Sequence, residues 1–142
     1  MHFSYFLYIF ANKICAVMIK LLLLMVFMHI VDDYYLQGIL AKMKQKSWWE
    51  KQEGYKSMYK DDYKMALLMH STSWSIMILL PAMFMLNTNP YALLAIFVIN
   101  AFIHYHIDDL KANKLKINLM FDQTIHIMQV ITTWILVQQW VL

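Results

Sequence analysis

Hydrophobic residues in this chain form four long runs, and they follow neither the alternation of a strand nor the narrow stripe of an amphipathic helix. A helix crosses a bilayer with about 17 to 25 mostly apolar residues, and each run has that length. The predicted spans cover residues 14–35, 65–86, 91–107 and 119–142. We therefore predict an all-α fold, a four-helix transmembrane bundle that makes residues 1–142 a single membrane domain.

The link at residues 37–64 differs from the spans because it is polar and basic. It holds seven lysines and four acidic residues, together with Trp48, Trp49 and Gly54. Tryptophan is enriched at the depth of the lipid headgroups, and glycine often ends a helix. We predict one or two interfacial helices in this link, with a break near Gly54.

The lysines also predict the orientation of the spans. Ten of the twelve lysines lie in the link at residues 37–64 and in the link between the third and fourth spans. Lysine-rich links usually face the cytoplasm. We therefore predict a multi-pass protein, integral to the cytoplasmic (inner) membrane, with both charged links cytoplasmic and both termini outside.

The composition of the chain indicates which classes of binding partner to expect. Hydrophobic residues make up 61% of the chain and charged residues 15%, against about 25% charged in a typical soluble domain. The net charge of +3 is small and scattered, so we predict no nucleic-acid partner. The single Cys15 excludes an internal disulfide framework. The expected partner is the lipid bilayer, and a bundle of this kind can also form homo-oligomers.

Histidine and aspartate recur at a spacing of four residues in three places, and a further histidine lies early in the second span. Side chains four residues apart project from the same face of a helix. In the predicted topology all of these side chains lie near the cytoplasmic ends of four separate spans. They are His29 and Asp33, His70, His104 and Asp108, and Asp122 and His126.

Imidazole and carboxylate side chains on facing helices are typical metal ligands. We predict that these seven residues hold a divalent metal, and that the nitrogen and oxygen ligands favour Zn, Mn or Fe. Seven ligands exceed the four of a tetrahedral ion, so the sequence indicates one or two ions. The alternative interpretation is a set of plain ion pairs, each worth about 0.3–0.5 kcal/mol.

The neighbours of the pairs divide into two groups. On an α-helix Asp32 and Asp109 point about 100° away from the paired acids, so we expect them to face solvent or to act from a second layer. Four further polar side chains flank the pairs and are expected to orient ligands or to meet an anionic substrate: Gln37, Lys44, Lys111 and Gln123.

Three segments resemble motifs of a family of small phage and bacterial integral membrane proteins without an assigned function. Residues 29–37 resemble its H-x-x-x-D-[FY]-x-L-Q motif, residues 104–111 its H-[FY]-x-[IL]-D-x-x-K motif, and residues 122–126 its D-Q-x-[IL]-H motif. The family is distantly similar to membrane-bound metal-dependent hydrolases, and the resemblance implies that activity. The family more often has a small residue where this chain has Asp32, which leaves open whether Asp32 or Asp33 faces inward.

Three functions follow from these observations. The first is a metal-dependent hydrolase at the cytoplasmic leaflet, acting on a lipid or isoprenoid phosphate, with Asp33 and His70 as catalytic residues and His70 as ligand or general base. The second is a non-enzymatic, phage-type membrane protein that binds a host partner or modifies the envelope, with a structural His/Asp cluster. The third, an ion conduit, is disfavoured because the outer halves of the spans lack acids and histidines.

Overall fold

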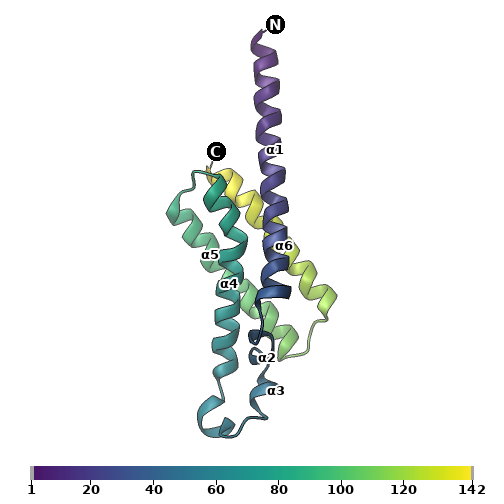
Figure 1. The fold of residues 1–142 in the computed structure, drawn as a ribbon, viewed down its shortest axis with the longest axis vertical. Helices are drawn as coiled ribbons and strands as arrows, with labels where there is room; N and C mark the ends of the chain where they lie inside the picture. The colour runs from purple at the N-terminus through teal and green to yellow at the C-terminus, as the bar shows by residue number, and fades with distance from the viewer. Residues whose placement is uncertain (1, 142) are drawn as a thin grey trace.

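The computed structural model describes residues 2–141, and the side chains of residues 12–139, as an all-helical chain (Figure 1). No strand occurs within residues 2–141. The elements in order are α1 (His2–Ile30), η1 (Val31–Leu36), α2 (Leu40–Met43), α3 (Lys46–Trp49), η2 (Tyr55–Tyr59), α4 (Asp62–Met85), α5 (Pro90–Ala112) and α6 (Leu119–Val141), where η denotes a π-helical turn.

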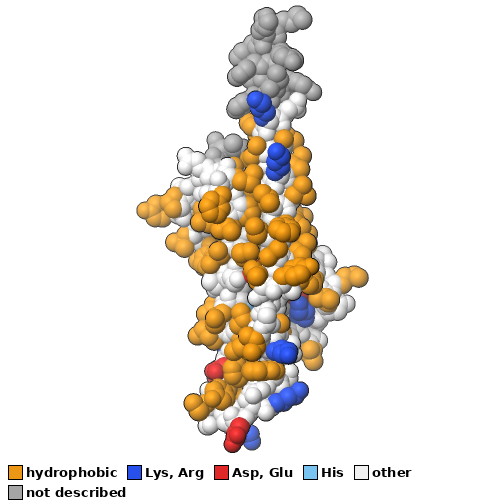
Figure 2. All heavy atoms as spheres, in the orientation of Figure 1, with side chains coloured by type: hydrophobic (Ala, Val, Ile, Leu, Met, Phe, Trp, Pro, Cys, Tyr) orange, Lys and Arg blue, Asp and Glu red, His pale blue; other side chains and the backbone are white. Residues whose placement is uncertain are grey.

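Three of these helical segments are long and apolar enough to cross a membrane. They are Asn12–Leu36, Asp62–Met85 and Pro90–Ala112. The finding agrees with a membrane protein, and these segments cover the first three predicted spans except for Leu86, which ends α4 as its C-cap. Figure 2 shows hydrophobic side chains over the middle of the molecule, whereas charged side chains gather at the end that carries α2 and α3.

The fourth predicted span corresponds to α6, which has 23 residues but is not one of the three segments apolar enough to cross a membrane. It carries Asp122, Gln123, His126 and Gln129 within its first eleven residues. The structure therefore confirms a helix here, while its passage through the membrane stays a prediction. Leu142, the last residue of the predicted span, lies outside the described residues.

Three helices are longer than their predicted spans, and of these α4 differs least because it begins three residues earlier, at Asp62. The first helix begins at His2 rather than near residue 14, and it continues through the π-helical turn η1 to Leu36. The third ends at Ala112 rather than at residue 107, where Asn113 serves as its C-cap. Because α5 continues past residue 107, His104, Asp108 and Lys111 share one helix face at intervals of one turn.

The helices pack with α4 against α1 and α5, and with α6 against α1 and α5 (Figure 1). Their shared core is apolar and fully buried, and it lies on the side of the molecule away from α2 and α3. It contains Leu21, Met25, Trp74, Ile78, Ala82, Val130 and Val137. Burial of these side chains holds four long helices at fixed separations, which lets polar groups at one end of the bundle meet.

The basic link forms short helical turns. Gly54 has a φ of 80°, a conformation that favours glycine, and it precedes η2 at the predicted helix break. Trp49 is buried within the link, where its indole N–H donates to the carbonyl oxygen of Met43 at 2.6 Å. The position of α2 and α3 at the membrane surface stays a prediction.

Candidate metal centre

The structure brings the seven predicted ligands together in one place, which we call the His/Asp cluster. They come from α1 with η1, α4, α5 and α6. All four histidines are almost fully buried, and so are Asp108 and Asp122. Asp33 keeps only 5% of its side chain exposed. The seven side chains therefore lie together in space, as the sequence predicts.

The π-helical turn η1 places both Asp32 and Asp33 against His70. Oδ2 of Asp32 is 3.6 Å from Nδ1 of His70, and Oδ1 of Asp33 is 3.2 Å from Nε2 of the same ring. Asp32 is 1% exposed and accepts a hydrogen bond from Ser73 Oγ at 2.6 Å. Of the two expectations for Asp32, the solvent-facing position was wrong and the second-layer position agrees with these contacts, since a π-helical turn places successive side chains differently from an α-helix.

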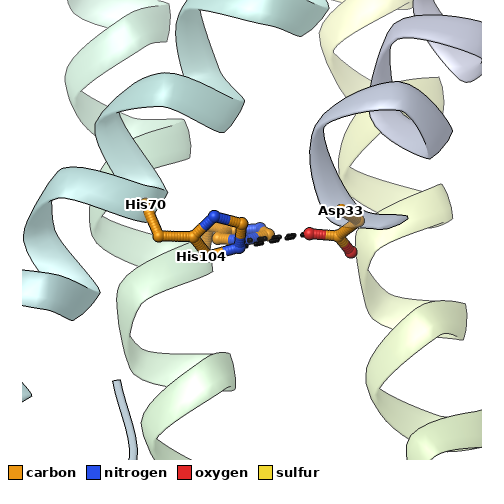
Figure 3. A group of neighbouring side chains, drawn as sticks. All are labelled: Asp33, His70 and His104. Atoms are coloured by element: carbon orange, nitrogen blue, oxygen red, sulfur yellow. Dashed lines mark hydrogen bonds and ion pairs between the residues drawn. The ribbon is translucent and has the colours of Figure 1, made fainter. Parts of the chain in front are cut away.

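Asp33, His70 and His104 present three ligand atoms to one another (Figure 3). Nε2 of His70 lies 3.1 Å from Nε2 of His104 and 3.2 Å from Oδ1 of Asp33. The distance between Nε2 of His104 and Oδ1 of Asp33 is 3.8 Å. These three atoms belong to η1, α4 and α5, so only the assembled bundle creates this group.

Asp108 connects this group to a second one. Its Oδ2 is 3.4 Å from Nε2 of His70, and its Oδ1 is 3.4 Å from Nε2 of His126. His104, Asp108 and His126 form the second set of side chains whose ligand atoms lie close enough for one metal ion. Asp122 adjoins this set, with its Oδ1 also 3.4 Å from Nε2 of His126.

His29 lies in the cluster but belongs to neither set of three. Its Nδ1 accepts a hydrogen bond from the indole N–H of Trp74 at 2.8 Å, and it lies 3.8 Å from Oδ2 of Asp33. An indole nitrogen can only donate, so Nδ1 of His29 is the acceptor and its lone pair is occupied. His29 as a metal ligand stays a prediction.

The four flanking residues all contact carboxylates of the cluster. Lys44 Nζ lies 2.6 Å from Oδ2 of Asp108, and Lys111 pairs with Oδ2 of Asp122. The amide of Gln37 donates to Oδ1 of Asp33. The amide of Gln123 lies between two acids, 3.1 Å from Oδ2 of both Asp33 and Asp122.

Asp109 and His106 lie away from the cluster. Asp109 pairs with Lys114 at 2.7 Å at the end of α5, and this hydrogen bond raises the pKa of Lys114. His106 is exposed and packs against the ring of Phe102. Both observations agree with side chains that leave the face shared by His104 and Asp108.

The charges of the cluster do not balance. Four buried carboxylates, on Asp32, Asp33, Asp108 and Asp122, meet the two ammonium groups of Lys44 and Lys111. Four negative charges against two positive charges leave a net charge of −2 when the imidazoles are neutral. An uncompensated buried charge is costly, so this arrangement favours a bound cation.

Residues that sequence reasoning missed surround the ligands. Ser73 donates to Asp32, and Trp74 stacks on the ring of His104 with centroids 4.3 Å apart. These two residues follow His70 by three and four positions, so they lie on its face of α4. This spacing could have identified them, because a polar or indole donor one turn from a buried histidine is a common orienting partner.

The cluster lies nearer the lysine-rich end of the bundle. The fourteen residues between Pro90 and His104 span about 21 Å at 1.5 Å per residue, and the fifteen between His70 and Met85 about 22 Å. A bilayer core is about 30 Å thick. With the turn between α4 and α5 at one edge of the core, the cluster lies about 8 Å inside the other edge.

Comparisons of the chain with family models, with curated proteins and with solved structures gave no match. The resemblance of three segments to motifs of a phage and bacterial family therefore stays a prediction. The geometry and charge of the cluster carry the inferences about function.

Proposed function

We propose that this protein binds a divalent metal ion within the membrane and uses it to hydrolyse a phosphate-bearing lipid at the cytoplasmic leaflet. One observation carries the proposal. Nε2 of His70, Nε2 of His104 and Oδ1 of Asp33 converge in a buried cluster whose net charge is −2 when its histidines are neutral.

The spacing of the ligand atoms supports the metal. Two ligands about 2.0–2.2 Å from a tetrahedral ion lie about 3.3–3.6 Å apart. The three shortest separations around Nε2 of His70 are 3.1, 3.2 and 3.4 Å, to His104, Asp33 and Asp108. These separations around Nε2 of His70 are close to the spacing that a tetrahedral ion requires, and Nε2 of His104 lies 3.8 and 3.9 Å from the carboxylate oxygens of Asp33 and Asp108. One divalent ion also neutralises the excess charge.

The ligand types favour Zn, Mn or Fe. Imidazole nitrogen and carboxylate oxygen suit these borderline and hard ions, whereas soft ions prefer sulfur. Cys15, the single cysteine, is exposed on α1 and contributes nothing to the cluster. A bound ion would supply Lewis-acid polarisation of a phosphoryl oxygen and would make water a stronger nucleophile near neutral pH.

The residues around the ion would then have different roles. Asp33, His70, His104 and Asp108 hold the ion. Asp32 and Ser73 orient His70 from its Nδ1 side, as second-layer partners of ligating histidines commonly do. Lys111, which keeps 26% of its side chain exposed, can neutralise a phosphate that approaches from the charged end of the bundle.

The position of the cluster supports a lipid substrate. With α6 as a fourth span and the lysine-rich links in the cytoplasm, the cluster lies just beneath the cytoplasmic headgroups. A mostly apolar groove of about 330 Å³ runs between α5 and α6, and its lining includes Ile103 and Ile125, the neighbours of His104 and His126. Such a groove offers a surface for the hydrocarbon chain of the substrate.

A second candidate is a structural ion-pair network in a protein that binds a host partner or modifies the envelope. The pairing of Lys44 with Asp108 and of Lys111 with Asp122 favours it, because the first pair joins the basic link to α5 across 64 residues and the second joins α5 to α6. In this function the remaining negative charge is neutralised by protons on histidines.

Elemental analysis of the protein purified in detergent distinguishes the two. The hydrolase proposal expects about one equivalent of Zn, Mn or Fe in the wild type and in His106→Ala, a control that removes an exposed histidine from the same helix as His104. It expects His104→Ala and Asp33→Asn to lose the metal while circular dichroism shows the helices intact. Folded wild-type protein that binds none of these metals on reconstitution would refute it.

A release assay then tests the chemistry. The wild type loaded with metal should release phosphate from a lipid or isoprenoid phosphate in detergent micelles, and the metal-free His104→Ala variant should not. Equal phosphate release by the two proteins would refute the hydrolase proposal, although the protein would still be a metal-binding protein.

A further inference from the structure

Three potential ligand atoms lie beside the proposed metal site and are not ligands of its ion. Nε2 of His126 lies 3.4 Å from Oδ1 of Asp108 and 3.4 Å from Oδ1 of Asp122. His126 and Asp122 are 0% exposed, and within the described residues Nε2 of His126 and Oδ1 of Asp122 have no hydrogen-bond partner. Buried polar atoms of this kind are rare and call for an explanation.

The neighbouring hydrogen bonds define which nitrogen of His126 carries a proton. The amide nitrogen of Gln129 donates to the main-chain carbonyl oxygen of Asn100 at 3.2 Å, and a carbonyl oxygen can only accept. The orientation of the Gln129 amide is therefore set, and its Oε1 faces Nδ1 of His126 at 3.2 Å. Because Oε1 also only accepts, Nδ1 must carry the hydrogen.

Asn100 is itself held in place. Its amide nitrogen donates to Oγ1 of Thr133 at 2.8 Å, and its Oδ1 accepts from Gln129 at 3.3 Å. Asn100, Gln129 and Thr133 are all buried. This polar chain between α5 and α6 thus fixes the tautomer of His126 from the side opposite to the cluster.

With Nδ1 protonated, the neutral ring of His126 directs the lone pair of Nε2 at two carboxylate oxygens. The lone pair of Nε2 then faces two carboxylate oxygens, an arrangement that is repulsive without a cation or a second proton on the ring. The other oxygens of both acids are engaged elsewhere, Asp108 Oδ2 with Lys44 and Asp122 Oδ2 with Lys111 and Gln123. The two Oδ1 atoms and Nε2 are therefore the free ligands.

We infer that Asp108, Asp122 and His126 form a second cation site, and that Asp108 bridges it to the first. The inference rests on the proposed function, since the first site is the one at Asp33, His70 and His104. Asp108 serves each site with a different oxygen, Oδ2 toward His70 and Oδ1 toward His126. Carboxylate-bridged pairs of ions in helix bundles are built in this way.

The charge of the cluster decides when the second ion binds. One divalent ion cancels the net charge of −2, and a second would leave a charge of +2. A phosphate dianion supplies the two negative charges that balance it. The second ion therefore binds together with phosphate, which makes a phosphate monoester, with its doubly charged terminal group, the substrate class that fits this site.

Titration of the purified protein with Mn²⁺, followed by electron paramagnetic resonance, tests the inference. We expect one bound Mn²⁺ per chain in the absence of inorganic phosphate, and two in its presence with the spectrum of a spin-coupled pair. A wild type that binds neither Mn²⁺ nor, in parallel titrations, Zn²⁺ or Fe²⁺ would contradict the proposed function. A wild type that stays at one Mn²⁺ in phosphate would contradict only the second site, with His126 then holding a proton instead.

Variants separate the second site from the first. Asp122→Asn and Gln129→Leu should bind one Mn²⁺ with or without phosphate. Gln129→Glu keeps an acceptor opposite Nδ1 and should regain the second ion, which a merely space-filling role of Gln129 does not predict. Gln138→Leu is the matched control, since among the described side chains the amide of Gln138 donates only to the carbonyl of Trp134 in its own helix, and it should bind two Mn²⁺ in phosphate. Two bound Mn²⁺ ions in Gln129→Leu would show that the second ion does not depend on the tautomer of His126 that Gln129 fixes.

Discussion

Trp74 donates its indole N–H to Nδ1 of His29 across 2.8 Å, and this bond joins α4 to α1 inside the cluster. Both side chains are fully buried. His29 belongs to neither set of candidate ligands, and this bond links the two helices. Trp74 also stacks on His104, which makes it the packing centre of the histidines.

The variant Trp74→Phe should therefore lose stability but keep metal. Phenylalanine retains an aromatic ring against His104 but leaves Nδ1 of His29 without a donor, which costs about 1–3 kcal/mol. Unfolding in detergent, followed by circular dichroism, measures this loss. Trp48→Phe, in the half-buried part of the basic link, is the control and should change stability much less. Metal loss in Trp74→Phe at full helicity would contradict this prediction.

The contribution of Lys44 to the stability of the protein should depend on bound metal. Its ammonium group and Asp108 are both buried, 2.6 Å apart. Removing one member of a buried ion pair costs about 3–5 kcal/mol, because the other charge is left uncompensated. Lys44→Met should therefore be strongly destabilised in chelator. A bound divalent ion supplies new positive charge beside Asp108, so the cost should shrink in excess Mn²⁺.

Lys46→Met is the matched control for Lys44→Met. Lys46 is about half exposed and lies 3.9 Å from Glu50, and such surface pairs contribute about 0–1 kcal/mol. Its variant should unfold like the wild type in chelator and in Mn²⁺. An equal loss for Lys44→Met with and without metal would mean that no cation reaches Asp108.

The two adjacent acids of η1 should respond differently to neutralisation. Asp33→Asn removes a ligand oxygen 3.2 Å from Nε2 of His70 and should abolish metal binding. Asp32→Asn changes a partner on the Nδ1 side of that ring, and loss of such partners typically weakens metal affinity about 10–100-fold. Competition with a fluorescent chelator measures both affinities. The reverse order would make Asp32 the ligand.

The sequence could predict which residues meet, because the spacing of four residues and the length of each span are properties of α-helices. His104 with Asp108 and Asp122 with His126 follow that rule, and both pairs lie in the cluster. The lysine pattern could not predict that Lys44 reaches Asp108, 64 residues away, since that contact depends on how the basic link folds back.

The π-helical turn marks the limit of sequence reasoning. On an α-helix Asp32 and Asp33 point about 100° apart, and the residue types at positions 31–36 do not predict a π-helical turn. The tertiary partners Ser73 and His70 stabilise Asp32 in its buried position, and they come from α4. The polar chain of Asn100, Gln129 and Thr133 was missed for the same reason, because it joins two helices across a separation of about thirty residues.

The orientation in the membrane gives the last prediction. In a Cys15→Ser background, which removes the single native thiol, cysteines are placed at Lys56 in the basic link, at Asn87 between α4 and α5, and at Lys116 between α5 and α6. If α4, α5 and α6 all cross the membrane with the lysines inside, an impermeant maleimide should label intact cells only at position 87. Positions 56 and 116 should react after permeabilisation.

A tag after residue 142 completes the test of α6. An α6 that spans the membrane carries the tag to the side of position 87, where an antibody reaches it in intact cells. An α6 that stays at the cytoplasmic surface leaves the tag with positions 56 and 116. In that second outcome Asp122 and His126 would still face Asp108, but they would approach the cluster from the headgroup layer, where water can hydrate both carboxylates. The buried charge would then be smaller, and a metal would no longer be needed to balance it.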